Sequence, residues 1–218
     1  EMCIRDRAYR AFNARLLAEE TPADDEIVLT SGKSYSNVFH ANGGSASFSV
    51  MANTLRGVYG TDVLLATANS FTGSVLQADY NKKMAASMIM PNGLMSRQRT
   101  MTGAELKETV RAFVEGCEGG FVPFNRGSLP VVSGIAVEVK EAGGSYTLTG
   151  ITRNGQPLRD DDTVTVTCLA AENQMEALLA SESGTPLDGD AWVKNRWRDH
   201  VSGGGAALAE PENYMTLR

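Results

Sequence analysis

The chain has 218 residues, of which 42% are hydrophobic, and it carries a formal net charge of −6. This composition is sufficient for a buried core. The acidic balance and the lack of a basic run argue against nucleic acid as a partner, and every apolar run is well short of the roughly 20 residues of a membrane-spanning helix.

The first 44 residues are interpreted as two segments. Residues 1–7, EMCIRDR, match a translated sequencing adapter and are set aside as an artefact, so we expect the natural sequence to begin upstream. Residues 8–44 are predicted to form a linker helix and an arm that ends in the glycine- and serine-rich HANGGSAS. Four apolar residues of the linker share one helical face: Tyr9, Phe12, Leu16 and Leu17.

The main domain is predicted to span residues 45–218. A helix over Phe48–Tyr59, capped by Ser47, is followed by the apolar strand VLLAT. The stretch NSFTGSVLQADYNKKMAAS has no clean period and is interpreted as a loop. MIMPNGLMSRQRTM is then predicted to form extended segments around a Pro-Asn-Gly turn.

The next segment, TMTGAELKETVRAFVEG, predicts a capped helix. Thr102 and Glu105 have the spacing of a capping box, in which each residue bonds a free backbone N–H group of the first turn. One apolar stripe follows along the helix: Leu106, Val110, Phe113 and Val114.

The remaining sequence predicts strands and then helices. LPVVSGIAVEV is expected to be one strand, SYTLTGITRNGQPL a second that closes on an Asn154–Gly155 turn, and DDDTVTVTCLA a third. Helices are predicted over 172–183 and 191–201, before a flexible SGGGAA and a C-terminal tail. Packing of Trp192 and Trp197 against the domain is favoured over a sugar-binding face, because a spacing of five residues does not align them on a helix. Helices, strands and helices in this order indicate an α+β domain.

Residues that could hold a catalytic metal ion are sparse. His40 and His200 are far apart and neither has ligand-like spacing, so we predict no catalytic residue and no metal site in this chain. The acidic RDDDT is interpreted as a solvated turn rather than a calcium loop. Cys117 and Cys168 are each expected to be buried thiols, although a single bridge between them stays open.

Four fragments occur in a specific order: GTDVLLATANS, TMTGAELKETV, VVSGIAVEV and ITRNGQPLRDDDTVTVTCLAA. Over about residues 45–171 this order resembles the C-terminal domain of the bacterial 5'-nucleotidase family, which includes UDP-sugar hydrolases and cyclic-nucleotide phosphodiesterases. The resemblance implies layered helices and mixed sheets behind a helical linker. It also implies an extracytoplasmic protein, whether periplasmic, secreted or on the cell surface, in which an N-terminal domain outside this sequence holds the divalent metals.

The resemblance also implies substrate-binding positions, and three of them match: Asn69, Gly93 and Gly134. Others differ, because Ser74 replaces an arginine and Asn92 replaces a phenylalanine that stacks on the base. The fragment AAENQMEALL replaces a loop with a second stacking aromatic. Since Ser, Asn or Met cannot reproduce a stacked ring, the nucleotide pocket is predicted to be rewritten.

Phe121 and Phe124 flank Pro123 and are candidates for a substitute ring, although core positions are favoured for both. Two functions stay open on this basis. The first is the nucleotide-binding C-terminal domain of a 5'-nucleotidase-like hydrolase of nucleotide catabolism, not catalytic alone. The second is a non-catalytic scaffold or binding module of a larger surface protein, which binds another small ligand or a partner.

Overall fold

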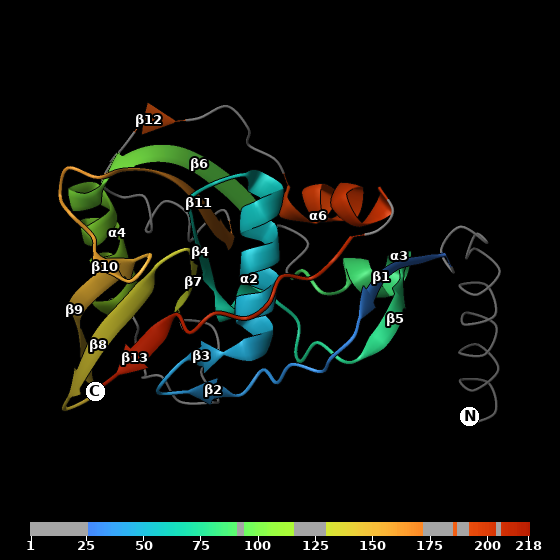
Figure 1. Ribbon diagram of the computed structural model, residues 1–218, viewed down its shortest axis with the longest axis horizontal. Helices are drawn as coiled ribbons and strands as arrows, with labels where there is room; N and C mark the ends of the chain where they lie inside the picture. Colours follow the sequence, from blue (N-terminus) through green and yellow to red (C-terminus); the bar gives the residue numbers. More distant parts are fainter. Residues whose placement is uncertain (1–25, 91–93, 116–129, 172–184, 187–191, 204–205) are drawn as a thin grey trace, which may run out of the picture.

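The computed structural model describes residues 26–90, 94–115, 130–171, 185–186, 192–203 and 206–218 (Figure 1). Mixed sheets combine with a few helices, which confirms the predicted α+β class. Several predictions fall outside the described residues: the adapter segment, the linker helix, Asn92, Gly93, Cys117, Phe121, Phe124 and the helix over 172–183.

A five-stranded sheet forms the centre of the fold, in the order β12-β6-β11-β4-β7. Its strands are β12 (Thr185–Pro186), β6 (Leu94–Thr102), β11 (Thr163–Ala171), β4 (Val63–Thr67) and β7 (Pro130–Ser133). β11 runs parallel to β4, and the other neighbours are antiparallel. Every residue of β4 and β7 is buried. Both faces of the sheet are therefore covered at these strands, as their continuous apolar sequences predict.

A second sheet has the order β10-β9-β8-β13. It consists of β10 (Gln156–Pro157), β9 (Ser145–Arg153), β8 (Ala136–Ala142) and β13 (Met215–Leu217). The predicted turn between β9 and β10 is confirmed, since Asn154 and Gly155 have φ angles of 53° and 74°. The single strand predicted over LPVVSGIAVEV is wrong, because the chain breaks at Gly134 into β7 and β8 of different sheets.

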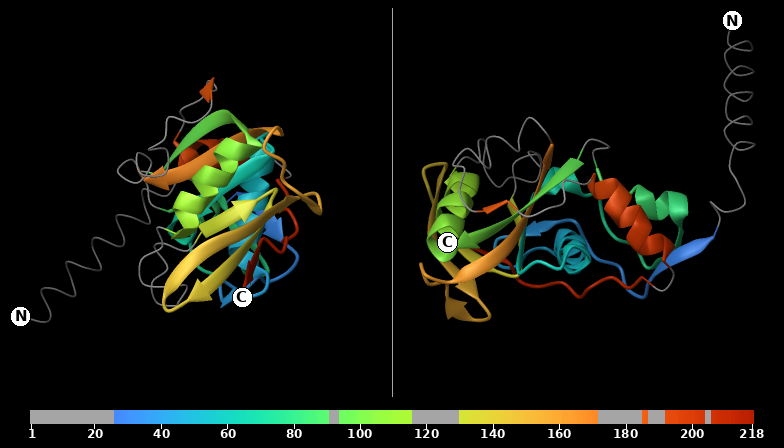
Figure 2. Two further views of the ribbon diagram at one scale, coloured as in Figure 1. Left: turned by 90° about the vertical axis from the view of Figure 1, so that its left-hand side faces the viewer. Right: turned by 90° about the horizontal axis from the view of Figure 1, so that it is seen from above.

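Four α-helices and a short 3₁₀ turn lie in the described residues: α2 (Ala46–Tyr59), η2 (Ala68–Ser70), α3 (Lys82–Ala86), α4 (Gly103–Glu115) and α6 (Val193–Ser202). α2 packs against β4 and β7, whereas α4 contacts β6 of one sheet and β9 of the other. The right-hand view of Figure 2 shows α2 and α4 on opposite sides of the five-stranded sheet. The structure is therefore layered, as the family resemblance implies.

The helix caps confirm one prediction and correct another. At α4, Thr102 N donates to Glu105 Oε2 at 2.7 Å and Glu105 N donates to Thr102 Oγ1 at 3.2 Å, so the capping box is present. All four residues of the predicted apolar stripe are buried. At α2 the cap is Ser45, whose Oγ accepts from Phe48 N. Ser47 instead donates to the Gly73 carbonyl at 2.9 Å.

The arm and the C-terminal tail both pack into the fold. In the arm, β1 (Ile27–Ser31) pairs with β5 (Ala78–Asn81), and β2 (Phe39–His40) pairs with β3 (Gly44–Ser45). The C-terminal tail is fixed to the fold, because Tyr214 is buried and its hydroxyl accepts a hydrogen bond from Ser45 N at 3.1 Å. A side chain at Gly44 would meet the Tyr214 ring at 2.3 Å, which explains a glycine there.

The family-like fragments meet at one end of the five-stranded sheet, which we call the framework end and define by Asp62, Gly103, Gly134, Arg159 and Thr165. Asp62 Oδ2 accepts from Thr165 N at 2.8 Å and from Thr165 Oγ1 at 2.9 Å. Partial burial opposes ionisation of Asp62, but these bonds and the positive charges of Arg153 and Arg56 outweigh it and lower the pKa of Asp62.

Two glycines allow the close approaches at the framework end. A Cβ at Gly134, whose φ is +82°, would lie 2.1 Å from the Asp62 carbonyl oxygen. A Cβ at Gly103 would lie 1.8 Å from the Arg159 carbonyl oxygen, and Gly103 N donates to Asp162 O at 2.7 Å. The turn RDDDT, residues 159–163, therefore contacts the first residues of α4. Each fragment that carries the resemblance contributes at least one residue to the framework end.

We predict that Gly134→Ala lowers the free energy of unfolding more than Gly155→Ala does. Both residues have positive φ, but the added Cβ meets nothing within 4 Å at Gly155. Gly155→Ala should cost about 1–2 kcal/mol of conformational strain, whereas Gly134→Ala also has to displace the Asp62 carbonyl. Urea unfolding of both variants measures the difference, and equal small losses would contradict the close approach.

Candidate functional site

The opposite end of the five-stranded sheet is the candidate site. Here the carboxyl ends of the parallel strands β4 and β11 lie side by side, since Leu65 pairs with Cys168. Open sheets with parallel strands bind ligands outside these carboxyl ends. We call this region the carboxyl edge and define it by Asn69, Ser70, Met90, Met95 and Trp192.

Asn69 and Ser70 lie in η2, directly after β4. Asn69 is exposed, so its amide is accessible to a ligand. Ser70 is fully buried, and its Oγ has no hydrogen-bond partner among the described residues. Met90 N donates to the Ser70 carbonyl at 3.1 Å and so ties the segment before β6 to this turn. A buried hydroxyl without a partner is costly, which makes Ser70 a candidate for a bond to a water or a ligand.

Trp192 presents an aromatic face at the same edge. Its backbone pairs with Met95 near the start of β6, and Met95 pairs with Ala170 near the carboxyl end of β11. Trp192 is 48% exposed and is the one aromatic among the large exposed hydrophobic residues of the described chain. An exposed indole offers a flat apolar surface and an N–H donor.

The two tryptophans therefore have different roles. Trp197 is fully buried and its Nε1 donates to the Ala85 carbonyl at 2.7 Å, which confirms the predicted packing. The same prediction is wrong for Trp192. The spacing of five residues argues only against a face shared by both rings, so it is compatible with one buried and one exposed tryptophan.

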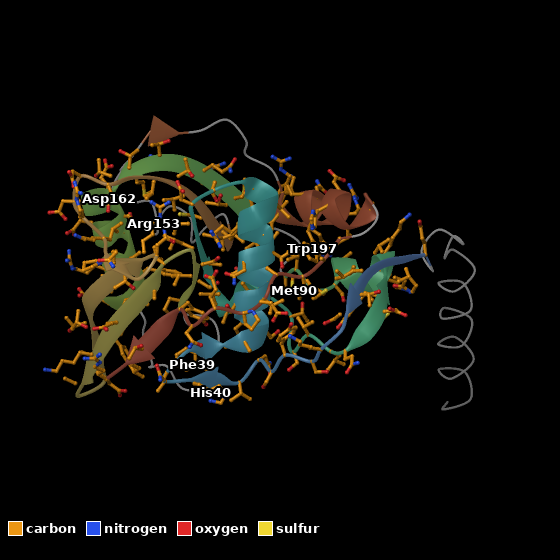
Figure 3. All side chains as sticks on the ribbon, in the orientation of Figure 1. Phe39, His40, Met90, Arg153, Asp162 and Trp197 are labelled. Carbon is orange, nitrogen blue, oxygen red and sulfur yellow. The ribbon has the colours of Figure 1, made fainter. Side chains whose placement is uncertain are left out.

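The structure separates two of the predicted binding residues. Asn69 lies at the carboxyl edge, whereas Gly134 lies at the framework end beside Asp62. In Figure 3, Arg153 and Asp162, which contact residues of the framework end, lie on the left, and Met90 of the carboxyl edge lies to the right of α2. The binding roles proposed for Asn69, Gly93 and Gly134 stay predictions.

Ser74, which stands where the family has an arginine, is held by the arm. Its Oγ accepts from Asn37 N at 3.2 Å and donates to Asn37 Oδ1 at 3.1 Å. The short hydroxyl is therefore engaged in fixing the loop after η2 to the arm. It offers neither the reach nor the charge of a guanidinium group.

The described residues include possible metal ligands and one free cysteine. Within these residues no group of three or more His, Cys, Asp and Glu side chains is placed to hold a metal ion. Cys168 is a free thiol whose pKa is raised to about 12 by burial, so it is unsuited to act as a nucleophile at neutral pH. In the described part of the chain, no helix is both long and apolar enough to cross a membrane.

We predict that acrylamide quenches Trp192 and spares Trp197, which gives a curved quenching plot for the wild-type chain. The chain has two tryptophans. Trp192→Phe should therefore leave a blue-shifted emission with little quenching, because only the buried indole remains. Indistinguishable quenching of the wild type and the variant would show that Trp192 is covered in solution.

Comparison with known proteins gives matches in structure only. No family model and no curated protein matches the sequence. A 5'-nucleotidase precursor from Thermus thermophilus matches with a TM-score of 0.69 and 13% identity, over 100% of this chain and 43% of that chain. The sulfate thiohydrolase SoxB from Thermus thermophilus, solved with glycerol, has a TM-score of 0.70 and 13% identity, over 97% and 38%. The NAD nucleotidase from Haemophilus influenzae has a TM-score of 0.62 and 16% identity, over 96% and 41%.

The chain spans about two fifths of the length of each of these proteins. Because the identities are this low, the matches show similarity of fold alone. They confirm at that level the resemblance inferred from four short fragments: the chain has the fold of the C-terminal region of a 5'-nucleotidase.

Proposed function

We propose that this chain is the nucleotide-binding C-terminal part of a 5'-nucleotidase-like hydrolase that serves nucleotide catabolism outside the cytoplasm. The observation that carries the proposal is the match of the whole chain to 43% of a 5'-nucleotidase precursor. The ordered fragments add support from the sequence, because their order along the chain is independent of the structural match.

Catalysis is assigned to a metallophosphoesterase domain outside this sequence. Phosphoester hydrolysis of this type uses metal ions to activate water and to stabilise the transferred phosphoryl group. The described residues contain no cluster suited to that role. The divalent metals are therefore proposed to bind in the other domain, and this chain is proposed to need no cofactor of its own.

The carboxyl edge is the proposed surface for the base and the sugar. The exposed amide of Asn69 supplies two donors and one acceptor, and the exposed ring of Trp192 supplies a stacking face. One ring cannot enclose a base as two rings do. We therefore expect binding to be weak, with a dissociation constant of about 1 mM or higher.

The second candidate function is a scaffold or binding module without nucleotide hydrolysis even in a longer protein. One observation favours it: the framework end keeps the family-like fragments, whereas Ser74 is occupied with Asn37 in place of an arginine. A fold can be retained while its ligand surface changes. Binding measurements separate the two candidates.

We predict weak, saturable binding of AMP to the purified chain and no release of phosphate with added Mg²⁺ or Mn²⁺. Calorimetry and Trp192 fluorescence should give the same dissociation constant, about 1 mM or higher. Trp192→Ala and Asn69→Ala should each weaken binding about fivefold or more, through loss of the stacking face or of the amide.

The outcomes separate the two functions. Absence of saturable binding of AMP, adenosine and a UDP-sugar up to about 10 mM would favour the scaffold. Metal-dependent hydrolysis of AMP that co-purifies with this polypeptide would contradict the assignment of catalysis to a domain outside this sequence. Ser36→Ala serves as a control, because Ser36 lies in the arm rather than at the carboxyl edge.

A further inference from the structure

A groove of about 620 Å³ lies between α2, α6 and the C-terminal segment Ala207–Ala209. None of the residues that line it belongs to the carboxyl edge or to the framework end. Its volume is within the roughly 300–1,000 Å³ of small-molecule sites. The groove is therefore a separate candidate site, and it does not depend on the proposed nucleotidase function.

The polar groups on the α2 side of the groove are already bonded within the protein. Asn53 Nδ2 donates to the Glu210 carbonyl at 2.8 Å, and its Oδ1 accepts from Ser133 Oγ. Thr54 Oγ1 donates to the Val50 carbonyl at 2.7 Å and accepts from Ala209 N at 3.0 Å. This side thus offers shape and apolar contact rather than free hydrogen-bonding groups.

The α6 side carries polar side chains that are not fully bonded within the described residues. Arg196 and His200 are one turn apart, at positions that share a helix face. Arg196 makes no ion pair with any residue that the structure describes, and its guanidinium carbon lies 5.8 Å from the centre of the Tyr59 ring. His200 Nε2 is buried without a hydrogen-bond partner in the same described residues.

Stacking on Tyr59 restricts the Arg196 guanidinium while leaving its N–H edge available. A planar guanidinium binds a carboxylate or a phosphate through two parallel hydrogen bonds. Asp199 brings a negative charge to the same wall, but Arg198 Nε lies 3.8 Å from its Oδ1. The wall therefore retains a cation suited to an oxyanion.

Gly57 opens the α2 side of the groove beneath this wall. A Cβ added at Gly57 would meet no heavy atom within 4 Å, so the space beside it is empty of protein. Gly57 lies inside α2, where glycine lowers helix stability by about 1 kcal/mol relative to alanine. Gly57 thus weakens α2 and leaves open space beside it, as expected if a ligand occupies that space.

We propose that this groove binds a small molecule that carries a carboxylate or a phosphate group on an apolar body. Arg196 binds the oxyanion, with His200 beside it. The apolar body lies over Gly57 and against Val58 and Leu208.

Titration calorimetry with phenyl phosphate and with benzoate tests the proposal on the full chain, and benzyl alcohol serves as a neutral control. At least one anion should bind saturably, and the neutral control should bind about tenfold more weakly or not at all. Whichever anion binds more tightly identifies the group. Equal binding of benzyl alcohol, or no binding of either anion up to about 10 mM, would overturn the proposal.

Four variants locate the binding. Arg196→Ala should weaken it about tenfold, and Asp199→Asn should strengthen it because a repulsive charge is removed. Gly57→Leu should abolish it by filling the groove, while the better helix propensity of leucine keeps the protein folded. Lys194→Ala removes another cation of α6, one that does not line the groove, and should leave binding within about twofold. Unchanged binding in both Arg196→Ala and Gly57→Leu would place the ligand elsewhere.

Discussion

The carboxylate of Asp62 joins the main layers of this fold. It accepts two hydrogen bonds from Thr165 of β11 in the five-stranded sheet, and Arg153 of β9 in the second sheet donates to its other oxygen at 2.5 Å. The Asp62 carbonyl lies so close to position 134 that only a glycine fits there. Arg56 of α2 also reaches this carbonyl, and its Nε donates to Ser133 Oγ at 2.8 Å. The ion pair with Arg153 is partly exposed and contributes little by itself, so the bonds to β11 matter most.

This constraint explains why the fold can be recognised from short fragments while the proposed ligand surface cannot. The fragments supply Asp62, Gly103, Gly134 and Thr165, which must fit one another within the distances of direct contact. At the carboxyl edge, by contrast, Met90 N bonds the Ser70 carbonyl and Trp192 pairs with Met95, both through the backbone. Loops and strand ends can therefore change their side chains while the framework stays the same. The contacts that fix the fold and the proposed ligand surface thus lie at opposite ends of one sheet.

The sequence predicts the features that depend on neighbours along the chain. The capping box of α4, the Asn154–Gly155 turn and the α+β class all follow from local spacing. The break at Gly134 does not, because the apolar run continues through it and the need for positive φ arises from the distant Asp62.

The same reasoning applies to the remaining corrections. The pairing of the C-terminal tail with β8 could not be predicted, because nothing in the composition of the tail indicates it. At the candidate site the binding role of Asn69 is a prediction from the resemblance, whereas the exposure of Trp192 was missed because a tryptophan is ordinarily assigned to a core. Trp192 is exposed where its backbone pairs with Met95, and this contact between distant parts of the chain is not visible in the local sequence.

The most direct measurement is a double-mutant cycle between Asp62→Asn and Thr165→Val, followed by urea unfolding at neutral pH. Each change keeps the shape of the side chain and removes part of the same hydrogen-bonded contact. The account predicts a coupling energy of about 1 kcal/mol or more between the two positions, as found for residues in one network. Additive effects of the two substitutions would contradict the central position of Asp62 in the framework.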